Sequence, residues 1–265
     1  RKGVGRQGLS DGAGHGRSAR KIDGGALDRA FLAIGATGVQ VRCLHAGSAC
    51  APDGTRTARA PAHASARPDR IGERGRIAML HALAHIEFVA IDLAFDLIGR
   101  FGGAFPAAFV DDWMRVGSEE AMHFALLDRR LRQMGSHYGA LPAHDGLWQA
   151  AADTAHDVLA RLAIVPMVLE ARALDITPAT AARFEEAGDA VSTAILRRIM
   201  SDEIRHVAAG TNWFRHAANR SGVEPIKYYQ TMVKRHFRGG LKAPFNDSAR
   251  RQAGLTRDFY DALAT

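Results

Sequence analysis

The sequence contains little cysteine, few aromatic residues and no long uninterrupted apolar run. Of its 265 residues only Cys43 and Cys50 are cysteines, and aromatic residues make up 7%. Because both cysteines precede residue 70, no disulfide framework can hold a core formed by the rest of the chain. The pair matches no zinc-binding pattern by itself, and a reducing cytoplasm is the expected location. No apolar run reaches the roughly 18–20 residues that span a bilayer, so we expect no membrane segment.

The first seventy residues differ in composition from the remainder. They contain 12 Lys or Arg against 5 Asp or Glu, and 12 of the 27 glycines, but only one aromatic residue, Phe31. Residues 1–70 can therefore bury too little apolar surface to offset chain entropy, and we predict a basic, disordered tail. One interpretation makes this tail an arm that contacts nucleic acid or a membrane surface. The alternative is an unstructured leader without a role.

From residue 71 onward apolar residues recur at intervals of three and four, which is typical of amphipathic helices. We predict one all-α domain over residues 71–265, built as a four-helix bundle with an outer C-terminal segment at 219–265. The predicted long helices are 72–99, 106–134, 146–174 and 189–218; shorter helices are expected at 178–187, 225–237 and 247–253. Pro166 should kink the third long helix one turn before Glu170.

Two Glu-x-x-His motifs carry the chemistry, Glu120 to His123 and Glu203 to His206. A spacing of three places the carboxylate and the imidazole on one helical face, where both can reach the same ion. The motifs are 83 residues apart, as are Glu87 and Glu170, and each of these two glutamates precedes its motif glutamate by 33 residues. The chain thus repeats a helix pair that offers Glu on one member and Glu-x-x-His on the other. This ligand pattern is that of di-iron and di-manganese carboxylate bundles.

Apolar residues flank these glutamates at helical spacing, so the carboxylates are expected to be buried and to need compensation. Four carboxylates and two neutral imidazoles balance the charge of two divalent cations. An oxygen-rich set with two nitrogens and no thiolate favours iron, with manganese as the alternative. The competing interpretation pairs the glutamates with Arg172 and Arg205. The acidic residues that precede each motif, Glu119 and Asp202, could accept the second imidazole N–H of a ligand histidine, or could simply be surface charges.

Several strings resemble a known bacterial family: His81-Ala-Leu-Ala-His85-Ile-Glu87, Glu119-Glu120-Ala-Met-His123-Phe124, Leu141-Pro-Ala-His-Asp-Gly-Leu-Trp148, Leu169-Glu-Ala-Arg172 and Pro244-Phe-Asn246. Over about residues 70–255 the chain resembles the ferritin-like family catalogued as domain of unknown function 455. This resemblance implies a ferritin-like bundle with a di-iron-type site on the six residues above. It implies no established reaction, although a more distant similarity links such proteins to tRNA-modifying di-iron monooxygenases.

Three functions are compatible with these observations. The first is an oxygen-activating di-iron oxidoreductase, a hydroxylase or oxidase, that acts on a small molecule or RNA and receives electrons from a reductase. The second is iron handling by a ferroxidase, which would require a closed cage for storage. The third is a metal-stabilised RNA-binding module that uses the basic tail. The oligomeric state is left open, a homodimer included.

Overall fold

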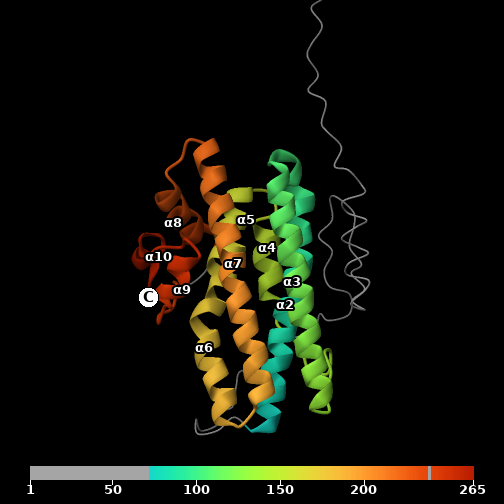
Figure 1. Ribbon diagram of the computed structural model, residues 1–265. Helices are drawn as coiled ribbons and strands as arrows, with labels where there is room; N and C mark the ends of the chain where they lie inside the picture. Colours follow the sequence, from blue (N-terminus) through green and yellow to red (C-terminus); the bar gives the residue numbers. More distant parts are fainter. Residues whose placement is uncertain (1–71, 238–239) are drawn as a thin grey trace, which may run out of the picture.

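The computed structural model describes residues 72–237 and 240–265 and confirms an all-α fold for them (Figure 1). In these residues the only β-type pairing is an isolated bridge between Leu241 and Ala264. The tail predicted for residues 1–70 and the two cysteines lie outside the described residues.

The first two long helices form an antiparallel pair. Helix α2 spans Glu73–Phe101, a 3₁₀ turn follows at Gly102–Ala104, and α3 spans Ala107–Gln133, in agreement with the helices predicted from the sequence. The two helices approach closely at Gly117, where an added Cβ would lie 3.3 Å from the Cβ of Ala94. Glycine at this position therefore lets α3 pack directly on α2, one turn before Glu120.

The third predicted helix, 146–174, is wrong as a continuous element. The chain instead forms α4 (Gly146–Asp153), α5 (Val158–Ile164), a π-helix called η2 (Val165–Glu170) and α6 (Ala171–Glu186). The break between α4 and α5 has a local cause, because the side chain of Asp157 accepts hydrogen bonds from the backbone N–H groups of Leu159 and Ala160 and so begins a new helix.

The short helix predicted for residues 178–187 does not exist separately. Pro178 lies inside α6, which runs without interruption from the π-helix to Glu186. The distortion expected from Pro166 is present, but it takes the form of the π-helix rather than a simple kink. Gly210 on the facing helix touches the ring of Pro166, and a Cβ at this glycine would overlap that ring.

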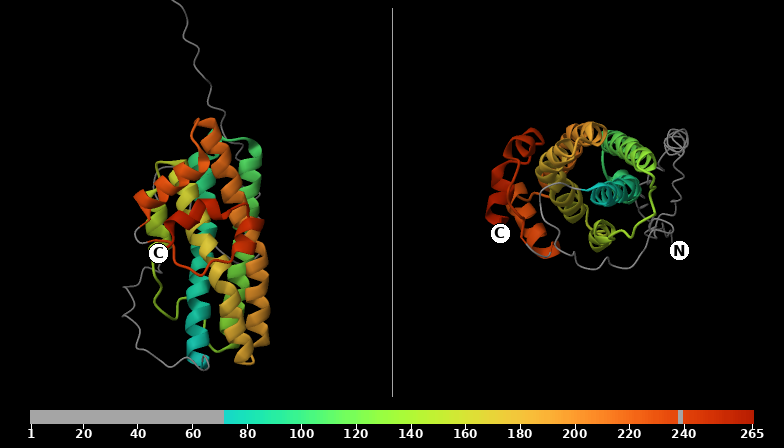
Figure 2. Two further views of the ribbon diagram at one scale, coloured as in Figure 1. Left: turned by 90° about the vertical axis from the view of Figure 1, so that its left-hand side faces the viewer. Right: turned by 90° about the horizontal axis from the view of Figure 1, so that it is seen from below.

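The last long helix, α7, spans Ala190–Arg220, and the shorter helices α8 (Pro225–His236), α9 (Asp247–Gln252) and α10 (Arg257–Tyr260) follow. Asp189 caps α7 by accepting a hydrogen bond from the N–H of Ser192. Figures 1 and 2 show the long helices α2, α3, α6 and α7 side by side, with the C-terminal helices against one outer side. The main apolar core lies between these layers and includes Leu97, Leu162, Phe214 and Tyr229.

The helical stretch Glu73–Ala104 is long and apolar enough to cross a membrane by length and composition alone. It contrasts with the expectation of no membrane segment, which rested on uninterrupted apolar runs rather than on averaged hydropathy. Within the apolar window of this stretch, 61% is buried inside the protein. Because core helices of soluble proteins pass the same test, this finding is weak evidence for a membrane span.

Candidate metal centre

The six predicted ligand residues come from four helical segments. Glu87 lies on α2, Glu120 and His123 on α3, Glu170 at the end of η2, and Glu203 and His206 on α7. Five of them are buried, with exposed fractions from 0% for the two histidines to 5% for Glu87. Glu170 is half-buried. Groups that are distant in the sequence thus face a common interior region.

Four of the six residues form a compact group that could hold a metal ion. Each of Glu87, Glu120, His123 and Glu203 offers one ligand atom, and these atoms lie within 4.8 Å of one another. The Nδ1 atom of His123 lies 3.2 Å from Glu87, 3.4 Å from Glu120 and 3.9 Å from Glu203. These contacts join α2, α3 and α7 at one point.

The second histidine adjoins the same group. The Nδ1 atom of His206 lies 2.9 Å from Oε1 of Glu120 and 3.4 Å from Oε1 of Glu203. Because the other oxygen of Glu120 faces His123, this carboxylate lies between the two imidazoles, whose ring centroids are 5.7 Å apart. Glu120 is therefore within reach of both imidazoles.

Glu170 lies outside the compact group of four, but it interacts electrostatically with its members. Its Oε2 atom is buried and has no hydrogen-bond partner. Burial raises the pKa of Glu170 well above the ordinary value, and the charges of Glu120 and Glu203 raise it further. The carboxyl therefore faces the same interior region without a partner of its own.

Both outer imidazole nitrogens contact carboxylates in a reciprocal arrangement. The Nε2 atom of His123 on α3 lies 3.1 Å from Asp202 on α7, and Nε2 of His206 on α7 lies 2.8 Å from Glu119 on α3. Carboxylates in this position fix the ring orientation and the tautomer of a metal-binding histidine. With Nε2 occupied in this way, each ring presents its Nδ1 atom to the glutamates.

The arginines proposed as partners of the glutamates make other contacts. Arg172 donates to the backbone carbonyl of Lys242 and lies 3.5 Å from Asp175. Arg205 donates to Glu119 and to Asp202, at 2.9 Å and 2.6 Å, and so links the two carboxylates that support the histidines. The arginine interpretation is therefore wrong for both residues. The supporting role of Arg205 was missed, although its spacing of three from Asp202 is a helical pairing distance.

The pKa values of the cluster show how it compensates its own charge. Burial raises the pKa of Glu87 and of Glu203, and the charge of Glu120 adds to the effect. Burial acts to lower the pKa of His123, but hydrogen bonds to Glu120 and Glu87 outweigh it and raise that pKa to about 10. Protons on imidazoles and carboxyls thus balance the charge in the metal-free chain, and cations at the same place would displace them.

The supporting carboxylates behave in the opposite way. Burial acts to raise the pKa of Asp202, but hydrogen bonds from Arg198 and His123 prevail and lower it to about 2. A hydrogen bond from His206 lowers the pKa of Glu119 below its ordinary value. Both residues therefore carry a negative charge at neutral pH and can accept an imidazole N–H.

Comparison with known proteins places this chain in a family. The model of the family described as "Protein of unknown function (DUF455)" matches residues 38–261. The chain belongs to this family. It is also 40% identical over 195 residues to an uncharacterized protein of Haemophilus influenzae, an alignment that covers 71% of this chain and 68% of that protein. No solved structure matches the chain.

Proposed function

We propose that this member of the family is a ferritin-like di-iron carboxylate protein that activates dioxygen to oxidise a substrate. Glu87, Glu120, Glu170 and Glu203 would hold two iron ions together with the two motif histidines. The proposal is supported by the origin of these residues, one glutamate from each of two helical segments and a Glu-x-x-His motif from each of two others, which is the ligand set of ferritin-like di-iron and di-manganese proteins.

The observation that carries the proposal is a group of buried polar atoms that form no well-aligned hydrogen bond. Oε2 of Glu170 has no partner, whereas Oε2 of Glu120 and Nδ1 of His206 make only the ion-pair contacts described above. A buried polar atom costs about 1–3 kcal/mol when it is left wholly unsatisfied in a protein interior. All three atoms belong to the six predicted ligand residues, which we call the cluster, so one pair of cations would satisfy them together. Two divalent cations would also balance the four carboxylates.

The type of metal and the class of reaction follow from the donors. Carboxylate oxygen with one imidazole per ion suits iron, and manganese is the alternative. Bound ferrous iron supplies electrons that can reduce dioxygen. The chain contributes the rest: Asp202 and Glu119 keep His123 and His206 in position, and the buried helix faces exclude water. Repeated turnover would require an electron donor, for which a reductase is the expected partner.

The decisive experiment is anaerobic titration of the purified chain with ferrous iron, followed by exposure to oxygen. We expect two iron ions per chain by elemental analysis and a change in the optical and Mössbauer spectra when oxygen is added. Anomalous diffraction at the iron edge would locate both ions. Iron that is bound without any spectral response to oxygen would disprove the proposed reaction.

A matched pair of variants tests the site itself. Glu87→Gln and Asp92→Asn each neutralise a buried acid on α2, at 5% and 8% exposure, but only the first belongs to the cluster. We expect Glu87→Gln to lose at least one of the two iron ions and Asp92→Asn to retain both. Equal iron content in the two variants would contradict the ligand assignment.

A further inference from the structure

Glu170 is the predicted ligand whose direction depends on an irregular turn of the backbone. It is the last residue of the π-helix η2. Hydrogen bonds in a π-helix join residues five apart, so one turn holds about one residue more than an α-helical turn. One residue corresponds to about 100° around a regular helix. If η2 relaxed to an α-helix, Glu170 would therefore rotate relative to the residues on the other side of the turn.

The C-terminal segment, defined here as residues 225–237 and 240–265, holds the backbone before Glu170. Tyr229 of α8 is fully buried, and its hydroxyl group donates to the backbone carbonyl of Met167 at 3.3 Å. Met167 lies within η2 and precedes Glu170 by three residues. This contact joins α8 directly to the π-helical turn.

The same segment also holds the backbone after Glu170. Arg250 forms a two-point ion pair with Asp175, with distances of 2.9 Å and 2.6 Å, and the two side chains are 3% and 1% exposed. Asn246 donates its backbone N–H to Asp175 at 2.9 Å and its side-chain amide to the carbonyl of Leu174 at 3.1 Å. Separating a buried ion pair leaves an uncompensated charge, so the start of α6 is firmly attached to the segment.

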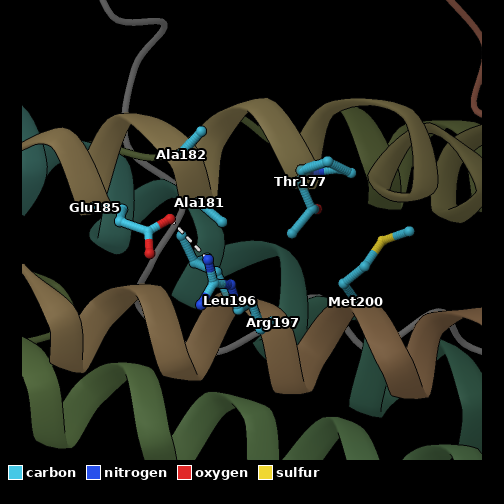
Figure 3. A pocket seen from close by; sticks show the side chains of 8 residues that line it. Thr177, Ala181, Ala182, Glu185, Leu196, Arg197 and Met200 are labelled. Atoms are coloured by element: carbon cyan, nitrogen blue, oxygen red, sulfur yellow. Dashed lines mark hydrogen bonds and ion pairs between the residues drawn. The ribbon is translucent and has the colours of Figure 1, made fainter.

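Packing of α6 against α7 is incomplete beyond this point. A pocket of about 260 Å³ lies in the seam between the two helices, where Thr177 and Ala181 of α6 face Leu196 and Met200 of α7 (Figure 3). Packed protein interiors leave few such spaces. Helix α7 therefore leaves α6 some room to turn, and the contacts with the C-terminal segment oppose such a turn.

We propose that the C-terminal segment positions Glu170 for the second of the two metal ions, with Tyr229 and Arg250 as the positioning residues. Their contacts lie on either side of Glu170 and keep the π-helical turn that directs this carboxylate toward the cluster. The compact group of four ligand residues does not include Glu170, so the first ion binds without help from the segment. This inference rests on the proposed function and deepens it by assigning residues outside the site to one metal position.

A pair of tyrosine variants tests the positioning in the metal-free chain. Tyr229→Phe removes the contact with η2, whereas Tyr260→Phe, at an equally buried position, removes a hydrogen bond to Asp247 within the segment itself. Hydrogen exchange of the backbone amides of residues 167–171, measured by mass spectrometry, is the assay. We expect exchange to become about fivefold faster in Tyr229→Phe, through the loss of one hydrogen bond, and to stay unchanged in Tyr260→Phe.

A pair of arginine variants tests the effect on metal binding, with Mn²⁺ as the probe. Arg250→Gln breaks the ion pair with Asp175, whereas Arg257→Gln breaks pairs with Asp247 and Asp261 inside the segment. In calorimetric titrations we expect Arg250→Gln to weaken the second Mn²⁺ ion by at least about tenfold and to leave the first unchanged. Arg257→Gln should bind both ions like the wild type. Electron paramagnetic resonance distinguishes a single Mn²⁺ ion from a coupled pair and checks the assignment.

The outcomes separate positioning from a general loss of stability. Equal exchange in the two tyrosine variants, equal Mn²⁺ binding by the two arginine variants, or a loss of affinity shared by both ions in Arg250→Gln would overturn the inference. Circular dichroism melting shows whether each variant folds, and the tyrosine pair decides alone if Arg250→Gln does not. A wild-type chain that takes up no Mn²⁺, while its amides exchange as expected, would instead overturn the proposed function and leave the positioning by the segment supported.

Discussion

Replacing Glu170 with glutamine should stabilise the metal-free protein while it weakens metal binding. Burial, followed by the charges of Glu120 and Glu203, raises the pKa of Glu170 well above its ordinary value of 4.5 in the folded chain. The unfolded chain ionises this carboxyl near the ordinary value. At neutral pH folding must therefore return a proton to the carboxyl, and this requirement opposes folding. Glutamine is uncharged in both states and removes the opposing contribution.

The size of this free-energy cost follows from the difference between the pH of the assay and the pKa of Glu170 in the unfolded chain. Each pH unit costs about 1.4 kcal/mol while the folded pKa lies higher, so the limit at pH 7 is about 3 kcal/mol. Because Glu170 as a whole is only half-buried, water reduces this cost, and we expect about 1–2 kcal/mol. For a domain of this size, the melting temperature should rise by about 2–8 °C.

Melting curves recorded by circular dichroism between pH 4 and pH 7, with a chelator present, provide the assay. The gain of Glu170→Gln should be small near pH 4, where both states are protonated, and should grow toward pH 7. Saturating Mn²⁺ should reverse the order, since a ligand at 100 times its Kd adds about 2.7 kcal/mol to the wild type. Glu186→Gln, at an exposed position of α6, is the control. A Glu170→Gln variant that melts below the wild type without metal at pH 7, or a gain independent of pH, would refute the reasoning.

Three further predictions concern the support of the site. Asp202→Asn should lower Mn²⁺ affinity about 10–100-fold in calorimetric titrations. Lowering the pH from 8 to 6 should also weaken Mn²⁺ binding. Burial acts to lower the pKa of His123, but contacts with glutamates outweigh it and raise that pKa to about 10. Mn²⁺ binding must therefore release a proton from this histidine. Gly210→Ala should lower the unfolding free energy in urea by about 1–3 kcal/mol, because its Cβ would overlap a proline ring, whereas Gly99→Ala, with no atom within 4 Å of the new Cβ, should not.

The sequence alone could predict the ends of the long helices and the side chains that share a helical face, because both depend on local backbone geometry. Glycine, proline and capping residues set the ends of α2, α3 and α7, and helical periodicity decides which side chains share a face. For this reason the repeated spacing of the glutamates and histidines was sufficient to predict that Glu87 and Glu203, 116 residues apart in the sequence, lie close together. For Glu119 the sequence left a contact with a histidine and a surface charge both open, and the structure contains the contact, with His206.

The break in the third helix could not be predicted because long-range contacts stabilise it. Arg161 is buried at 1% exposure, donates to Thr154 and the carbonyl of Ala151 at the break, and pairs at 2.6 Å with Asp96, 65 residues away on α2. Asp157 offers a local capping signal, but an aspartate within an apolar-periodic segment is equally compatible with an exposed helical position. The partner on α2 becomes apparent only when the helices are packed together.

The two halves of the chain repeat the same pattern of glutamates and histidines but not the same backbone, and they also differ at a pair of packing positions. An offset of 83 residues relates Leu83 and Leu127, in the first half, to Pro166 and Gly210 in the second. The two leucines belong to one apolar cluster and lie on the regular helices α2 and α3, whereas the proline packs directly on the glycine and lies in a π-helix.

This difference changes the surroundings of the corresponding glutamates. Glu87, on the regular helix α2, is buried and contacts His123 at 3.2 Å. Glu170, at the end of the π-helix, is half-buried, and its Oε2 has no partner. π-Helical turns are frequently found at functional sites. The sequence repeat therefore supplies matching donors, while the side of the cluster at η2 and α6, where Pro166 packs on Gly210, contains the carboxylate whose buried Oε2 has no partner.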